Sequence, residues 1–209
     1  MKTLLNPKAN KRFDITVLEL AIFSVVTIAA LAILLSQYAI RPTPHVASAS
    51  SKTTTHVALD IMPVKPGGPS ENWPAYLAST SLTVPAHSIV TVTIRNFDLG
   101  DAALTPNSPL AKVTGTVSNV ASFNGTSYSS LDAAKVSHTF TIPQLGLNVP
   151  IPGDAPANAN YLTVTFSFQT GKAGTYTFQC YAPCGTGTSG FDGPMASMAF
   201  MKGTLTVQG

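Results

Sequence analysis

Charged side chains are scarce in this chain of 209 residues, because Lys, Arg, Asp and Glu together make up only 10% of it. Hydrophobic residues make up 44%, which is too many for a disordered chain. Residues 57–209 carry six basic and seven acidic side chains, without a basic cluster. Binding to nucleic acid needs clustered Lys and Arg to neutralise phosphates, so we expect no nucleic-acid partner.

Motifs of hydrolytic enzymes are also missing. The chain has no Gly-x-Ser-x-Gly elbow, no His-Glu-x-x-His motif, no paired carboxylates and no glycine loop of the phosphate-binding kind. Hydrolytic catalysis is therefore disfavoured, which leaves electron transfer or pure binding. If the protein has an enzymatic role, we expect it to be that of an electron-transfer subunit in an oxidoreductase complex.

One long hydrophobic run is present near the N-terminus. Residues Leu20 to Ile40 carry no formal charge over 21 positions, about the length of a helix that crosses a ~30 Å hydrocarbon core. Four basic residues precede Phe13 and only Arg41 follows the run directly, which places the N-terminus in the cytoplasm. The small residues at 46–49 leave a cleaved signal peptide open as an alternative.

The chain is thus predicted to have four parts. They are a cytoplasmic N-terminus (1–13), a transmembrane helix (14–40), a tether rich in Ser, Thr and Pro (41–56) and an extracytoplasmic domain (57–209). The protein is expected in the cell membrane, with a single span. Outside the cytoplasm a disulfide can persist, so paired cysteines there do not by themselves indicate a metal.

Beyond the tether, short apolar runs alternate with Pro, Gly and Asn, which is the pattern of strands. The predicted strands are Val57–Met62, Ser81–Val84, Ile89–Asn96, His138–Ile142, Tyr161–Phe168, Gly174–Cys180 and Gly203–Val207. A short helical turn is expected over Ser130–Val136, and Gly100–Ser130 has the composition of an insertion. The domain is predicted to be all-β, a Greek-key sandwich or barrel.

The only two cysteines lie close together, in Cys180-Tyr-Ala-Pro-Cys184, and Met201 precedes the last predicted strand. Two thiolates on one turn and a returning thioether are soft ligands of the kind that copper prefers. A disulfide that closes this short loop is the alternative.

Several features of the chain occur together: the predicted anchor and tether, the segments 136–142, 174–180 and 201–207, and the Cys-x3-Cys-Gly loop. This combination resembles subunit II of haem-copper terminal oxidases. More broadly the chain resembles the cupredoxin family. The resemblance covers the anchor and residues 81–99 and 136–207. It implies a cupredoxin-like domain with a copper cofactor that passes electrons to or from a respiratory membrane complex or another redox partner protein.

Carried over residue by residue, the resemblance implies metal ligands at His138, Cys180, Cys184 and Met201. The family's second histidine ligand has no match, because no histidine lies between Gly185 and Phe200. A mononuclear site is still chemically sensible. The alternative is a redox-silent accessory subunit, with a disulfide between the two cysteines and His138 as a buried structural residue.

Other candidate residues have simpler explanations. Met195 and Met198 fit ordinary packing, and His45, His56 and His87 fit solvated positions. Trp73 and Tyr76 are expected to be apolar plugs at one end of the sandwich.

Overall fold

The computed structural model describes residues 54–65, 73–78, 80–185 and 193–209. The predicted cytoplasmic N-terminus and transmembrane helix lie outside these residues, as does the tether up to residue 53. Within the described part of the chain, no helix is long and apolar enough to cross a membrane. Strand β1 begins at Thr54, so His56 belongs to a strand.

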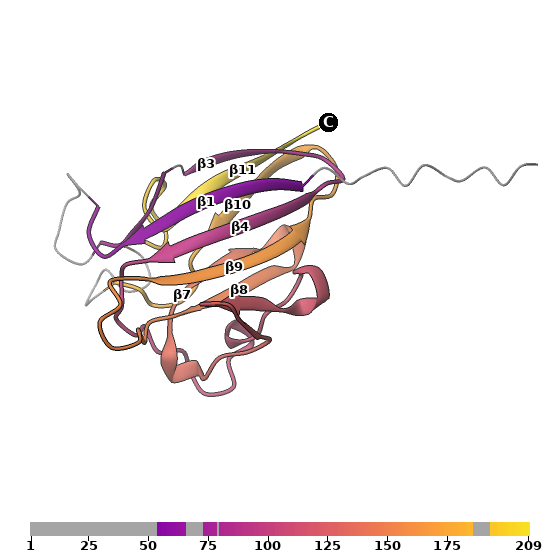
Figure 1. The fold of residues 1–209 in the computed structure, drawn as a ribbon. Coiled ribbons are helices and arrows are strands. Elements are labelled where there is room, and N and C mark those ends of the chain that lie inside the picture. The colour runs from indigo at the N-terminus through magenta and orange to yellow at the C-terminus, as the bar shows by residue number, and fades with distance from the viewer. Residues whose placement is uncertain (1–53, 66–72, 79, 186–192) are drawn as a thin grey trace, which may run out of the picture. The chain divides into compact units, whose positions relative to one another are not determined.

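The described strands form two sheets that face each other (Figure 1). The first has the order β2-β1-β4-β9-β5-β6 and the second has the order β3-β11-β10-β7-β8. Neighbours are antiparallel except β1 with β4 and β3 with β11, which are parallel. The prediction of an all-β domain is confirmed for the described residues. The strands are β1 (Thr54–Met62), β2 (Ala75–Leu77), β3 (Ser81–Pro85), β4 (Ile89–Asn96), β5 (Ala121–Phe123), β6 (Thr126–Tyr128), β7 (Val136–Ile142), β8 (Leu147–Pro152), β9 (Leu162–Gln169), β10 (Gly174–Gln179) and β11 (Lys202–Gln208).

Every predicted strand is present, with bounds that shift by at most three residues. The segment Gly100–Ser130 contains two short strands, β5 and β6, and the expected helical turn is the 3-10 helix η3 (Ala133–Lys135). The strands that the apolar pattern missed outside that segment are β2, of three residues, and β8. Strand β8 holds two prolines, and it lies at the edge of its sheet, where proline is tolerated.

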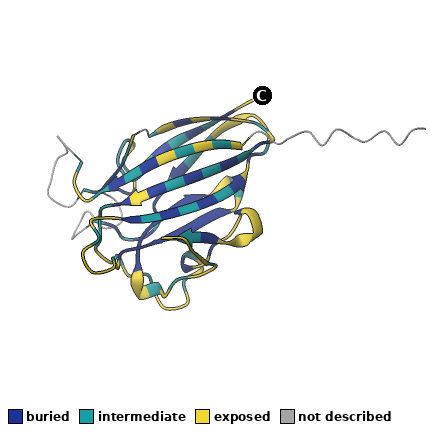
Figure 2. Ribbon diagram, in the orientation of Figure 1, coloured by how far each residue is buried: buried dark blue, intermediate teal, exposed yellow. Residues whose placement is uncertain are grey.

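Alternating burial along β4 and β9 identifies the face that each strand turns toward the second sheet (Figure 2). The interior between the sheets contains a cluster of aromatic rings. Phe140 stacks on Phe178 with ring centroids 5.1 Å apart, and Tyr76 meets both rings edge-on. Tyr76 is thus a buried residue of this cluster.

Strands β7 and β8 are buried on both faces, unlike β4 and β9. Their second face is covered by the segment that follows β4. The Asn148 side chain donates hydrogen bonds to the carbonyls of Leu110 and Lys112, at 3.0 and 2.7 Å, and the Tyr128 hydroxyl donates to the Pro150 carbonyl. The predicted insertion therefore covers β8, the strand that pairs with β7 and so lies beside His138.

Candidate metal centre

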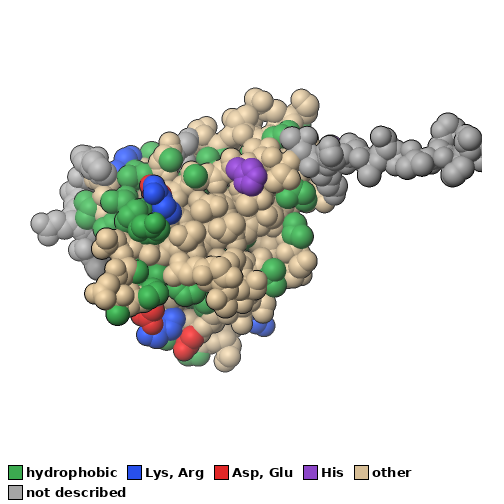
Figure 3. Space-filling view, viewed as in Figure 1, with side chains coloured by type: hydrophobic (Ala, Val, Ile, Leu, Met, Phe, Trp, Pro, Cys, Tyr) green, Lys and Arg blue, Asp and Glu red, His purple; other side chains and the backbone are tan. Residues whose placement is uncertain are grey.

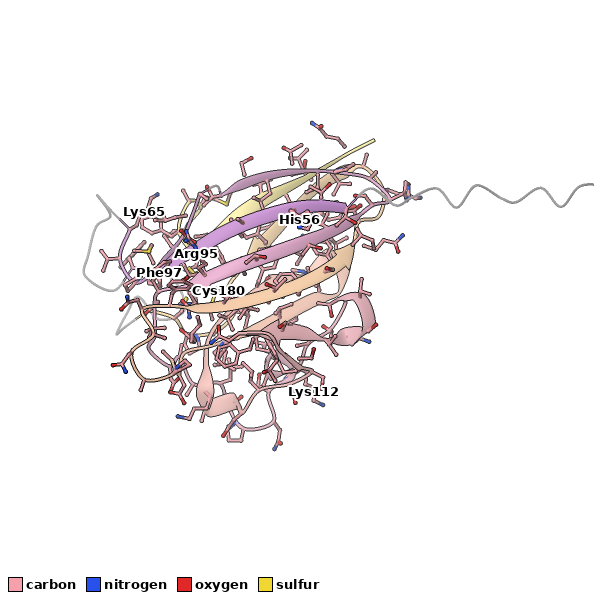
Figure 4. The ribbon with its side chains drawn as sticks, viewed as in Figure 1. His56, Lys65, Arg95, Phe97, Lys112 and Cys180 are labelled. Carbon is pink, nitrogen blue, oxygen red and sulfur yellow. The ribbon has the colours of Figure 1, made fainter. Side chains whose placement is uncertain are left out.

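The candidate site lies where β7, β10 and the start of β11 meet. His138 lies two residues before Phe140 on β7, and Cys180 lies two residues after Phe178, directly beyond the end of β10. Because side chains two residues apart on an extended chain point to the same face, His138 and Cys180 face the core, as the two phenylalanines do. Cys180 is labelled in Figure 4. The strand alternation that buries the two phenylalanines also points the imidazole and the thiol toward the same interior.

Backbone hydrogen bonds fix the turn that carries Cys180. The Cys180 N–H donates to the Met201 carbonyl at 2.9 Å, and the Tyr181 N–H donates to the Thr139 hydroxyl at 2.8 Å. The Thr139 N–H donates to the Cys180 sulfur at 3.4 Å. In the described part of the chain, β10 and β7 pair directly only at Gln179 and Thr141. The side-chain contacts of Thr139 therefore extend the connection between the two strands.

Three possible ligand atoms converge at this point. The Nδ1 atom of His138 lies 4.0 Å from the Sγ atom of Cys180, and one ring nitrogen of His138 and the Sγ atoms of both cysteines all lie within 4.8 Å of one another. His138 is 1% exposed, Cys180 is 0% exposed and Cys184 is 9% exposed. Both cysteines are free thiols. A buried imidazole beside two buried thiols fits a soft or borderline metal ion, so these residues could hold one.

Met201 lies beside this group through its backbone. It is fully buried, its N–H donates to the Pro194 carbonyl at 3.0 Å, and its carbonyl accepts from Cys180. Its role as a metal ligand stays a prediction. Met195 is buried nearby in sequence, whereas Met198 is exposed. The exposed side chains of His56 and His87 lie elsewhere on the surface, and neither belongs to the His–Cys–Cys group.

The thiols and the imidazole shift one another's protonation. Burial raises the pKa of Cys180, but hydrogen bonds with Cys184, His138 and the Thr139 N–H outweigh it and hold that pKa well below its ordinary value. The hydrogen bond to Cys180, together with burial, raises the pKa of Cys184. Burial lowers the pKa of His138, but Asp98 and Cys180 reverse this and bring it to about 9. The metal-free site thus favours one thiolate, one thiol and a protonated imidazole.

Asp98, which no sequence pattern had singled out, lies at the other side of the imidazole. Its Oδ2 atom lies 3.2 Å from His138 Nε2. Both residues line a cavity of ≈ 240 Å³ that also reaches Cys184. Asp98 follows the end of β4, on the opposite sheet from β7, so only the packing of the two sheets brings the pair together. No local sequence pattern could have revealed the contact.

Comparison with known proteins gives the following. No family profile matches the chain, and no curated protein matches it. A chain of a haem-copper terminal oxidase dimer is 15% identical, with 91% of this chain and 96% of that chain covered, at a TM-score of 0.35. Auracyanin B is 17% identical over 81% of this chain and 94% of its own, at a TM-score of 0.32. The copper protein rusticyanin is 17% identical over 74% and 81%, at a TM-score of 0.33. Similarities of this size do not establish a family, so the assignment of the site depends on its side chains.

Proposed function

We propose that this chain is a copper-binding protein of the cupredoxin class that transfers electrons. His138, Cys180 and Cys184 would hold the metal, with Met201 as a further ligand. The observation that carries the proposal is the convergence of one buried imidazole and two buried thiols on a single point. The aromatic core behind the site and the two-sheet scaffold support it, because a rigid site changes little between oxidation states.

The bound copper would supply the one-electron chemistry, and the residues of the chain would control its surroundings. Burial of His138 and Cys180 excludes water from the donor atoms. The Thr139 N–H donates to the Cys180 sulfur and so favours the thiolate, the form of cysteine that binds metal. Cys184, the most exposed of the three, lines the cavity and offers the shortest connection to solvent.

We further propose that the protein works at the outer face of a respiratory membrane, anchored by residues 14–40, with respiratory complex subunits or a redox protein as its partner. The uncharged run at 20–40 and the excess of basic residues before it support this location. Figure 3 shows few charged side chains on the face it presents. A surface with so little charge steers partners weakly over long distances.

Copper loading of the reduced full-length protein tests the proposal. We expect retained copper and a thiolate-to-copper absorption band in the wild type. The band should weaken in Cys180→Ser and in Cys184→Ser, each of which keeps one thiol, whereas His87→Gln, which changes an exposed histidine, should bind as the wild type does. A wild type that retains no copper, and whose two cysteines are found joined when the metal-free protein is not reduced, would instead identify the redox-silent accessory subunit.

A further inference from the structure

We propose that Asp98 is the positioning residue of this site: its carboxylate holds the ring proton of His138 on Nε2, so that Nδ1 presents its lone pair beside the two thiols. This inference rests on the proposed metal site and names a residue of the chain that controls it. An imidazole can bind a metal through either nitrogen, and the hydrogen bond made by the other nitrogen decides which one is free.

The contacts of the ring define its orientation. Nδ1 faces the Cys180 sulfur at 4.0 Å, and Nε2 faces Asp98 Oδ2 at 3.2 Å. Nε2 makes no hydrogen bond of good geometry with a described residue, and the Asp98 carboxylate is the charged group that faces it. With the ring 1% exposed, water does not readily replace the carboxylate. Asp98 is therefore the acceptor that we infer for the Nε2 proton.

Asp98 is itself held in place from two sides. Its carbonyl accepts hydrogen bonds from the Asn96 side chain at 3.0 Å and from the Ser137 hydroxyl at 3.0 Å. Its N–H donates to the Asn96 side-chain oxygen at 3.0 Å. Asn96 is fully buried and also donates to the Pro152 carbonyl. The end of β4 is thus bonded to both β7 and β8, which fixes the Asp98 backbone relative to the strand that carries the ring.

The loop beyond Asp98 is equally confined. The Ala102 N–H donates to the Val136 carbonyl at 2.8 Å. A side chain at Gly153 would meet the carbonyl of Gly100 at 2.6 Å, so this close approach of loop and β8 requires glycine. Asp101 lines the same cavity, but it pairs with Lys135 at 3.9 Å. Asp101 is therefore a matched control: an acid of the same type, at the same cavity, that is engaged elsewhere.

The test compares the full-length wild type with Asp98→Ala, Asp98→Asn and Asp101→Asn, and uses Cu(I) as the probe. Competition with a Cu(I) chelator should show an affinity about tenfold to a hundredfold lower in Asp98→Ala, the usual cost of losing such a support. Asp101→Asn should match the wild type. Asp98→Asn, whose amide oxygen can still accept the Nε2 proton, should lose less affinity than Asp98→Ala. If Asp98→Ala fails to fold, Asp98→Leu, which has a similar volume and no acceptor, takes its place.

Nitrogen NMR of the His138 ring gives a second measurement that a purely structural role would not change. In the Cu(I)-loaded wild type we expect the proton on Nε2 and the metal on Nδ1, with a slowly exchanging Nε2 proton that is lost to rapid exchange in Asp98→Ala. Equal affinity and unchanged spectra in Asp98→Ala would overturn the inference while leaving the proposed function intact, as would an equal loss in Asp101→Asn. A wild type that binds no Cu(I) would overturn the proposed function instead, and metal-free spectra recorded at a pH where the imidazole is neutral would then show whether Asp98 still holds the proton on Nε2.

Discussion

Replacing Tyr76 by Phe should destabilise the domain, although every ring contact of the aromatic core is kept. The Tyr76 hydroxyl donates to the Thr139 carbonyl at 2.8 Å, and both groups are buried. Pro150 lies opposite Thr139 in the β7–β8 ladder, and it has no N–H that could donate to the Thr139 carbonyl instead. The variant therefore leaves a buried acceptor without its donor.

The expected loss is about 1–3 kcal/mol, the cost of leaving one buried polar group unsatisfied. In a domain of this size each kcal/mol lowers Tm by about 2–4 °C. Tyr176→Phe is the matched control, because its hydroxyl donates to the Lys172 carbonyl at 3.0 Å at the exposed surface. That change should cost less than about 0.5 kcal/mol.

Urea denaturation of the metal-free, reduced full-length protein, followed by near-ultraviolet circular dichroism, measures both free energies of unfolding. The two variants should share the wild-type dependence on urea, so that their midpoints compare stability directly. Equal losses in Tyr76→Phe and Tyr176→Phe, or no loss in the first, would refute the role of this hydroxyl as the partner of β7.

Three further expectations can be checked independently. Gly203→Ala should lower the free energy of unfolding by about 1–3 kcal/mol, because a methyl group there would overlap the Phe178 ring. Gly171→Ala is the control and should be neutral, because a methyl group at Gly171 would meet no atom within 4 Å; equal effects of the two changes would count against the packing described. Apparent copper affinity, measured by chelator competition, should rise with pH, because the metal must displace the protons that the raised pKa values of His138 and Cys184 retain; an affinity that falls as the pH rises would contradict the assignment. Electron-transfer rates with a redox partner should depend only weakly on salt, given the scarce surface charge, and a steep dependence would point to a charged docking site.

The strands that positioned the site were predictable wherever one face is buried. The alternation in β4 predicted its bounds as they stand, because each buried residue is separated from the next by a partly exposed one. Strand β8 escaped prediction since Pro150 and Pro152 are breakers in most strands, and only its place at a sheet edge makes them acceptable. Strand β8 is also buried on both faces, so its sequence lacks the alternation of apolar and polar residues that marks a strand with one exposed face.

The site could be predicted in part. The spacing of Cys180 and Cys184 identified the soft-ligand turn, and the resemblance to a known family identified His138; the structure brings all three together. Asp98 could not be predicted, since the contact joins the end of β4 to a strand of the other sheet. Thr139 was missed for a similar reason, because its hydroxyl and N–H act on a turn from a different strand.

X-ray absorption at the copper edge of the loaded full-length protein tests the central claim most directly. We predict sulfur and imidazole nitrogen together in the shell of atoms bound to copper, with the sulfur contribution reduced in Cys184→Ser. A shell that contains only oxygen and nitrogen, and that does not change when Cys180 or Cys184 is replaced, would contradict a copper site built from these residues.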